Sequence, residues 1–161
     1  MDKGVFGRND RLIKEKSHDP YKQKGKLPQP TVCTECRASL QAGRWSWMAA
    51  PPGASSTTCP ACQRIADDFP AGHLEIHGTF FKKHQEELHN LIRNTEKVEK
   101  DAHPLERIMT LTTAEDHILV TTTGIHLARR LGEALKHSYK GDLDLTYGDG
   151  EQSILLAWRR D

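Results

Sequence analysis

The residues best suited to chemistry in this chain are four cysteines in two C-x-x-C pairs. Cys33-Thr34-Glu35-Cys36 is followed by twenty-two residues and then by Cys59-Pro60-Ala61-Cys62. Each pair can bring two thiolates from one tight turn to the same ion, and two such turns complete the tetrahedral four-thiolate site that zinc accepts readily. The spacing therefore predicts one zinc ion bound by Cys33, Cys36, Cys59 and Cys62.

Two other uses of the cysteines compete with a zinc site. Two disulfides would need an oxidising compartment, whereas the polar N-terminus Met1-Asp2-Lys3-Gly4 has no apolar signal-peptide core, so we expect a cytoplasmic protein with reduced thiols. The C-P-x-C pair is also typical of a redox dithiol at a helix start, although that role leaves the first pair unused. Because four thiolates leave zinc no open position for an activated water, we expect a structural, non-enzymatic site.

Other motifs give little sign of catalysis. The chain lacks G-x-x-x-x-G-K, G-x-S-x-G and H-E-x-x-H. The run Thr121-Thr122-Thr123-Gly124 before a predicted helix could hold an anion, but a helix cap at Thr123 explains the same residues. His73 and His77 could pair on a metal, but at strand spacing they are more typical of a solvated polar face.

The charge of the chain is unevenly distributed. The 161 residues are 36% hydrophobic and 28% charged, with a net charge of +1, and no apolar run approaches the roughly 18 residues of a membrane span. Residues 1–30 carry +4, residues 31–64 carry +2 and the remainder carries −5. A basic end joined to an acidic body predicts a polyanionic partner for the basic end.

RNA is the polyanion we expect from the residues in these basic segments. Lysines of the N-terminal arm could pair with phosphates, and two tryptophans beside arginines between and after the cysteine pairs could stack on bases. The alternatives are a merely solvated tail, and indoles that cover the metal or pack on the rest of the protein. The predicted nucleic-acid-binding residues are Lys14, Lys16, Lys22, Lys24, Lys26, Arg37, Arg44, Arg64, Trp45 and Trp47.

The pattern of apolar residues predicts an α+β protein in three parts. We expect a disordered basic arm over residues 1–30, a four-cysteine zinc ribbon over 31–64 and an α+β domain over 65–161. That domain should contain a short strand around His73 to His77, a long helix at about Phe80 to Lys100, and then a small ββαββ-type sandwich. Its predicted elements are strands at Arg107 to Thr113 and His117 to Thr122, a helix at Gly124 to Ser138, and a terminal hairpin centred on Gly148-Asp149-Gly150.

Several short motifs resemble a small bacterial zinc-ribbon family whose chains have a similar length. They are His18-Asp19-Pro20-Tyr21-Lys22, Cys33-x-x-Cys36 with Gly43-Arg44-Trp45, Cys59-Pro60-Ala61-Cys62-x-Arg64-Ile65, His103-Pro104-Leu105-x-Arg107-Ile108 and His126-Leu127-Ala128-Arg129-Arg130. More distantly, the ribbon followed by an α+β module is similar to the start of the nonsense-mediated-decay-three family, adaptors of the large ribosomal subunit. That family carries additional zinc-binding cysteines which are absent here.

Together these features predict a cytoplasmic, non-enzymatic zinc-ribbon protein that binds RNA, on the ribosome, through its arm and ribbon. One alternative is an adaptor whose ribbon binds another protein. The other is a thiol-redox factor that uses Cys59 and Cys62.

Overall fold

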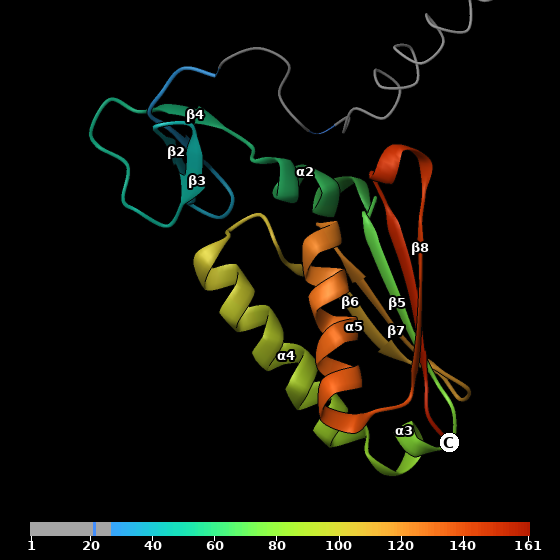
Figure 1. Ribbon diagram of the computed structural model, residues 1–161. Helices are drawn as coiled ribbons and strands as arrows, with labels where there is room; N and C mark the ends of the chain where they lie inside the picture. The colour runs from blue at the N-terminus through green and yellow to red at the C-terminus, as the bar shows by residue number, and fades with distance from the viewer. Residues whose placement is uncertain (1–20, 22–26) are drawn as a thin grey trace, which may run out of the picture.

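The computed structural model describes residues 21 and 27–161, which form four α-helices and two β-sheets (Figure 1). The predicted mixed α+β class is confirmed. The predicted arm lies almost wholly outside the described residues, and so do the five of its lysines that were predicted to bind RNA, Lys14, Lys16, Lys22, Lys24 and Lys26. The division of the chain into arm, ribbon and α+β domain stays a prediction.

The smaller sheet and the helix after it carry the four cysteines. The strands are β1 (Thr31–Cys33), β2 (Ser39–Gln41), β3 (Arg44–Ser46) and β4 (Ser55–Thr57), in the order β3-β2-β1-β4. Helix α2 (Pro60–Asp67) follows, and we call residues 31–67 the cysteine module. The predicted ribbon is not confirmed in detail, because the second cysteine pair lies at the start of a helix and not in a turn between strands.

The larger sheet has five strands in the order β6-β7-β5-β9-β8. They are β5 (Gly72–His77), β6 (Ile108–Thr113), β7 (Ile118–Thr122), β8 (Asp142–Tyr147) and β9 (Ile154–Arg159), with a short 3₁₀ turn η1 (Asp149–Glu151) between the last two. Strand β5 is parallel to β9, and the other neighbours are antiparallel. The predicted strand around His73 is thus the central strand of the body, which we define as residues 72–161.

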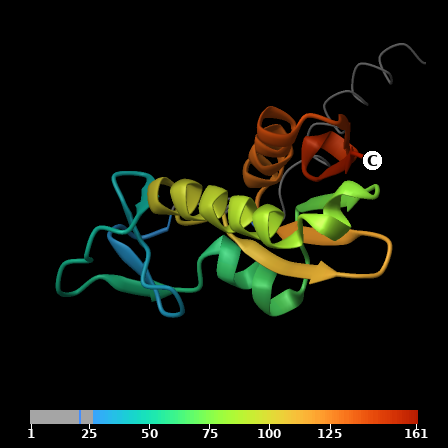
Figure 2. The same ribbon diagram turned by 90° about the horizontal axis from the view of Figure 1, so that it is seen from below.

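Two helices cover one face of this sheet. Helices α4 (Gln85–Ala102) and α5 (Ile125–Tyr139) lie side by side on it (Figures 1 and 2). A continuous helix from Phe80 is not confirmed, because α3 (Phe80–Lys83) ends at His84, whose φ of −127° and ψ of 28° are not helical. The His84 ring stacks on Phe80 at 4.0 Å between centroids, and its Nδ1 lies 2.6 Å from Glu87 Oε1.

The hydrophobic core fills the space between the helices and the sheet. Alternate residues of β5 and β9 face it, and α5 contributes residues three to four apart, as expected for a strand and a helix that each bury one side. The core residues from these elements include Leu74, Ile76, Leu131, Leu135, Leu156 and Trp158. The cysteine module packs at one end of this body, where Trp47 Nε1 donates a 2.7 Å hydrogen bond to the Lys100 carbonyl near the end of α4 (Figure 2).

Candidate metal centre

The four cysteine sulfurs converge on one point. The Sγ atoms of Cys33, Cys36, Cys59 and Cys62 all lie within 4.8 Å of one another, and all four cysteines are free. The Sγ atoms of Cys36 and Cys59 are 3.8 Å apart, which is far longer than a disulfide bond of about 2.05 Å. A tetrahedron with metal–sulfur bonds of about 2.3 Å has edges of roughly 3.8 Å, so this spacing fits a four-coordinate metal ion.

The first cysteine pair is held by the turn between β1 and β2. The N–H of Cys33 donates to the Ala38 carbonyl at 2.8 Å, and the N–H of Arg37 donates to the Cys33 carbonyl at 3.0 Å. The turn closes with Arg37 at a φ of 71°, in the left-handed region that side chains rarely adopt. These bonds fold the chain back sharply enough for Cys33 and Cys36 to point the same way.

The second pair occupies the first turn of α2. Cys59 is the N-cap residue, Pro60 takes the first helical position, and the N–H of Cys62 donates to Cys59 Sγ at 3.4 Å. Proline suits this position because its missing N–H would be unbonded there in any case. The positive end of the helix dipole therefore faces the sulfurs, where it favours the thiolate form.

A buried arginine from the body completes the surroundings of the sulfurs. Arg107, only 8% exposed, precedes β6 and donates from Nη1 to Cys62 Sγ at 3.3 Å. Its Nη2 donates to Cys36 Sγ at 3.3 Å and to Cys59 Sγ at 3.2 Å. A four-thiolate site with a divalent ion has a net charge of −2, so one buried guanidinium offsets half of it.

The body fixes the position of this arginine through its backbone. Arg107 Nε donates to the Pro104 carbonyl at 2.8 Å, and the Arg107 N–H donates to Thr123 Oγ1 at 2.9 Å. The Thr123 hydroxyl in turn donates to the Leu105 carbonyl at 2.6 Å. The prediction that Thr123 caps α5 is therefore wrong, since Gly124 is the N-cap residue and the Thr123 hydroxyl serves the segment before β6.

The protein environment pulls the thiol pKa values in opposite directions. Burial raises the pKa of Cys33, but the N–H groups of Cys59, Cys36 and Glu35 outweigh it and lower the pKa to about 6. Burial raises the pKa of Cys59 and of Cys62, and for Cys62 the hydrogen bond from Arg107 opposes this effect. Such a thiol set favours deprotonation when a cation neutralises it, as a bound metal ion does.

The structure separates the described residues that were predicted to bind RNA. Arg37 and Arg44 are exposed on the cysteine module. Arg64 is 5% exposed, donates to the Phe69 carbonyl at 2.9 Å and stacks on the Tyr21 ring, so it is not placed to meet a phosphate.

The two tryptophans have different surroundings. Trp45 packs against the cysteine cluster and lines a pocket. Trp47 is 38% exposed and docks on the body through its hydrogen bond to Lys100. Trp45 therefore lines a hollow that a ligand could enter.

The structure does not support the metal pair of His73 and His77 or the anion site at Thr121 to Gly124. His77 Nε2 lies 3.0 Å from Glu75 Oε1 on the polar face of β5, and among the described residues the four cysteines are the one group able to hold a metal ion. Near Thr121 to Gly124, the N–H of Leu127 in the first turn of α5 already donates to Glu106 Oε1 at 2.9 Å.

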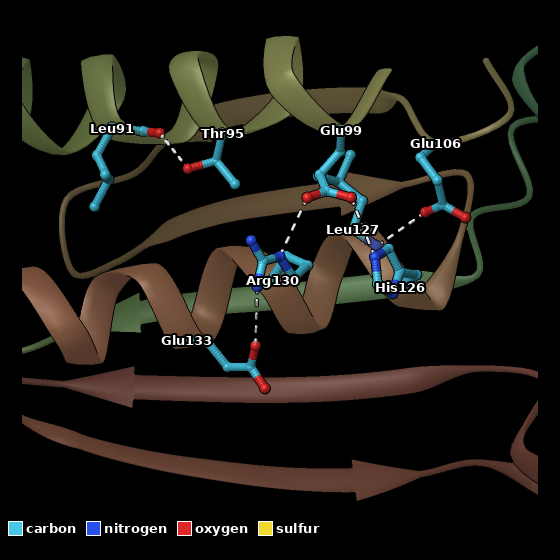
Figure 3. A network of polar contacts seen from close by, with 8 residues as sticks. All are labelled: Leu91, Thr95, Glu99, Glu106, His126, Leu127, Arg130 and Glu133. Atoms are coloured by element: carbon cyan, nitrogen blue, oxygen red, sulfur yellow. Dashed lines mark hydrogen bonds and ion pairs between the residues drawn. The ribbon is translucent and has the colours of Figure 1, made fainter. Parts of the chain in front are cut away.

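Two carboxylates that the sequence did not single out, the buried Glu99 and the half-buried Glu106, make polar contacts with α5 (Figure 3). Glu99 of α4 accepts from Arg130 Nε at 3.2 Å and lies 3.1 Å from His126 Nε2, which links α4 to α5. Glu106 approaches the start of α5 so closely that a Cβ on Gly124 would clash with its carboxylate group. Burial raises the pKa of Glu106, and the Leu127 N–H opposes that effect.

Comparison with known proteins gives no relative: no family model, curated protein or solved structure matches this chain. The resemblance to a zinc-ribbon family accordingly stays an expectation. Within residues 27–161, none of the helices is both long and apolar enough to cross a membrane.

Proposed function

We propose that this protein is a zinc-binding, non-enzymatic protein that associates with RNA, with the ribosome as the cellular RNA. The zinc-binding part of the proposal is supported by the convergence of four cysteine sulfurs beside Arg107. Four soft sulfur donors in tetrahedral spacing suit zinc, and they leave no coordination position for a substrate or a water. The metal then stabilises the cysteine module, which has a small core of its own.

The RNA part of the proposal rests on charge. Eight of the 23 Lys and Arg residues, and four of the 22 Asp and Glu residues, lie outside the described part of the chain. The described part therefore carries 15 basic and 18 acidic side chains, a net charge of −3. Phosphate contacts should come mainly from the arm lysines, with Arg37 and Arg44 extending the basic surface over the module.

The test is the salt dependence of RNA binding by the full chain. The affinity for a fluorescent single-stranded RNA of mixed sequence is measured at salt concentrations between about 50 and 200 mM. Over this range the affinity of a protein that makes several phosphate contacts falls steeply. Changing the five arm lysines predicted to bind RNA to glutamine should lower the slope of log affinity against log salt by about 3.5, at about 0.7 for each lost contact. The matched control changes five body lysines instead, namely Lys82, Lys83, Lys97, Lys136 and Lys140.

A lack of RNA binding at low salt, or an equal salt slope for both variants, would contradict the proposal.

Removal of residues 1–30 distinguishes the proposed RNA association from the adaptor alternative. An RNA-associated protein loses its ribosomal partner on this truncation, whereas an adaptor that binds through the cysteine module keeps its protein partner.

A further inference from the structure

A pocket of about 460 Å³ lies where the cysteine module meets the body. Arg44 and Trp45 contribute from β3 of the module, while His103, Glu106 and His126 contribute from the body. Its volume falls in the range of small-molecule sites, and it combines an apolar wall with a few polar groups, as such sites usually do.

The apolar wall of the pocket rests directly on the metal centre. Trp45 and Leu105 both line the pocket, and both pack against the buried cysteine cluster. Because Trp45 is only partly buried, its indole offers a flat surface of the kind on which an unpaired base stacks.

The polar side of the pocket is held in place by neighbouring side chains. Glu106 accepts from the Leu127 N–H with Oε1, which orients the carboxyl group and leaves lone pairs for a ligand (Figure 3). The His126 imidazole is held by Glu99, and its ring meets that of His103 edge to face, with centroids 6.2 Å apart. The acceptor and the imidazoles are therefore positioned before any ligand arrives.

An exposed cationic side chain is part of the pocket lining. Arg44 is exposed, and it forms no ion pair with any residue of the described chain. Its guanidinium can pair with a phosphate that lies outside the pocket while an attached base lies within it.

We propose that this pocket binds one unpaired nucleobase of RNA, stacked on Trp45, with its amino edge toward Glu106 and its phosphate at Arg44. The inference rests on the proposed association with RNA and names the site at which a base is read. A carboxylate accepts from exocyclic amino groups, so guanine, adenine and cytosine fit, and guanine fits best because its N1–H and N2–H donors are adjacent. Uracil presents one N–H between two carbonyl oxygens, which a carboxylate repels.

The pocket exists only while the module stays docked on the body. Its walls come from both parts, and the parts are joined by Arg107 at the sulfurs and by Trp47 at α4. Loss of the metal should unfold the module, and base binding should then be lost as well.

Titration of the full chain with 5′-GMP and 5′-UMP, followed by calorimetry and by the NMR signals of His103 and His126, tests this inference. We expect GMP to bind about tenfold more tightly than UMP, as one lost amino-edge contact implies. Glu106→Gln should abolish this preference, and Trp45→Leu should weaken both ligands about tenfold. Trp45→Phe keeps an aromatic ring against the cysteines and should weaken them less.

Matched controls use residues outside the pocket. Lys82→Ala and Lys136→Ala, exposed on the body away from the pocket, should leave nucleotide affinity unchanged, whereas Arg44→Ala should weaken both nucleotides. Zinc content and thermal melting check that each variant is folded. If RNA binds with the expected salt slope but nucleotides do not bind, the pocket inference is overturned and the proposed function stands. The same holds if the Trp45 variants keep full nucleotide affinity and Glu106→Gln keeps the preference for GMP over UMP. If neither RNA nor nucleotides bind, both are overturned.

Discussion

Arg107 and Cys59, forty-eight positions apart in the chain, are joined by a hydrogen bond of 3.2 Å from guanidinium Nη2 to Sγ. The same guanidinium reaches Cys36 and Cys62. The body thus supplies a cation to a sulfur cluster built by the module. Metal binding and the packing of module on body are therefore coupled through one buried side chain.

Arg107→Lys should speed the loss of zinc. A lysine ammonium lacks the planar fork with which the guanidinium reaches three sulfurs and the Pro104 carbonyl at once, so the sulfurs lose part of their hydrogen bonding. Loss of such an outer partner typically costs 10- to 100-fold in metal affinity. Transfer of zinc to a chromogenic chelator measures the effect, with exposed Arg37→Ala as the control. Equal transfer rates for Arg107→Lys and the unaltered protein would show that the arginine does not hold the metal centre.

Trp47→Phe should loosen the module from the body while leaving both parts folded. The substitution keeps the ring but removes the 2.7 Å hydrogen bond to the Lys100 carbonyl, which contributes about 1 kcal/mol. Hydrogen exchange at the amides of β3 and at the end of α4 should accelerate about fivefold. Exchange in the central strand β5 serves as the internal reference, and uniform acceleration there too would indicate general destabilisation instead of undocking.

Glu99→Ala should destabilise the body by roughly 1 to 3 kcal/mol, because it leaves His126 and Arg130 without their buried acceptor. Urea unfolding monitored by circular dichroism gives the value. The control is Glu133→Ala, whose carboxylate is exposed and lies 4.0 Å from Arg130 Nη1, and surface pairs of this kind contribute at most about 1 kcal/mol. Equal losses for the two variants would contradict the role of Glu99 as the link between α4 and α5.

Glu106→Gln should change how stability depends on pH. Burial raises the pKa of Glu106 above its ordinary value of 4.5. Between 4.5 and the raised value the folded protein binds a proton that the unfolded chain has lost, so stability falls as pH rises through this interval. Glutamine cannot ionise and still accepts from Leu127, so the variant should lack this fall.

The measurement for Glu106 compares unfolding free energies of the unaltered protein and the variant from pH 5 to pH 8. The difference should grow with pH in favour of the variant and then level off. Glu133→Gln, an exposed site, should show no such trend. Parallel curves for Glu106→Gln would mean that its folded and unfolded pKa values are the same.

The sequence predicted those parts of the fold that local patterns specify. The alternation of Leu143, Leu145 and Tyr147 and of Ile154, Leu156 and Trp158 predicted the hairpin of β8 and β9, which the structure confirms. The single helix predicted from Phe80 is interrupted at His84. The His84 ring stacks on Phe80 and bonds to Glu87, and these contacts stabilise a break that the spacing of apolar residues does not reveal.

Residues that reach the metal centre through long-range contacts could not be predicted from the sequence. The C-x-x-C spacing revealed the four cysteines because ligands three positions apart are a local signal. Arg107 has no such signal, since it meets sulfurs 45, 48 and 71 positions away. Arg64 looked like a surface cation, but Tyr21 and Phe69 cover it.

We propose above that the four cysteines hold one zinc ion. Native mass spectrometry of the full chain, purified without added metal, tests it most directly when combined with elemental analysis and thiol counting. We predict one zinc per chain, its loss in Cys59→Ser, and four free thiols after chelation. A metal-free protein with two disulfides, or a bound iron–sulfur cluster, would contradict the account.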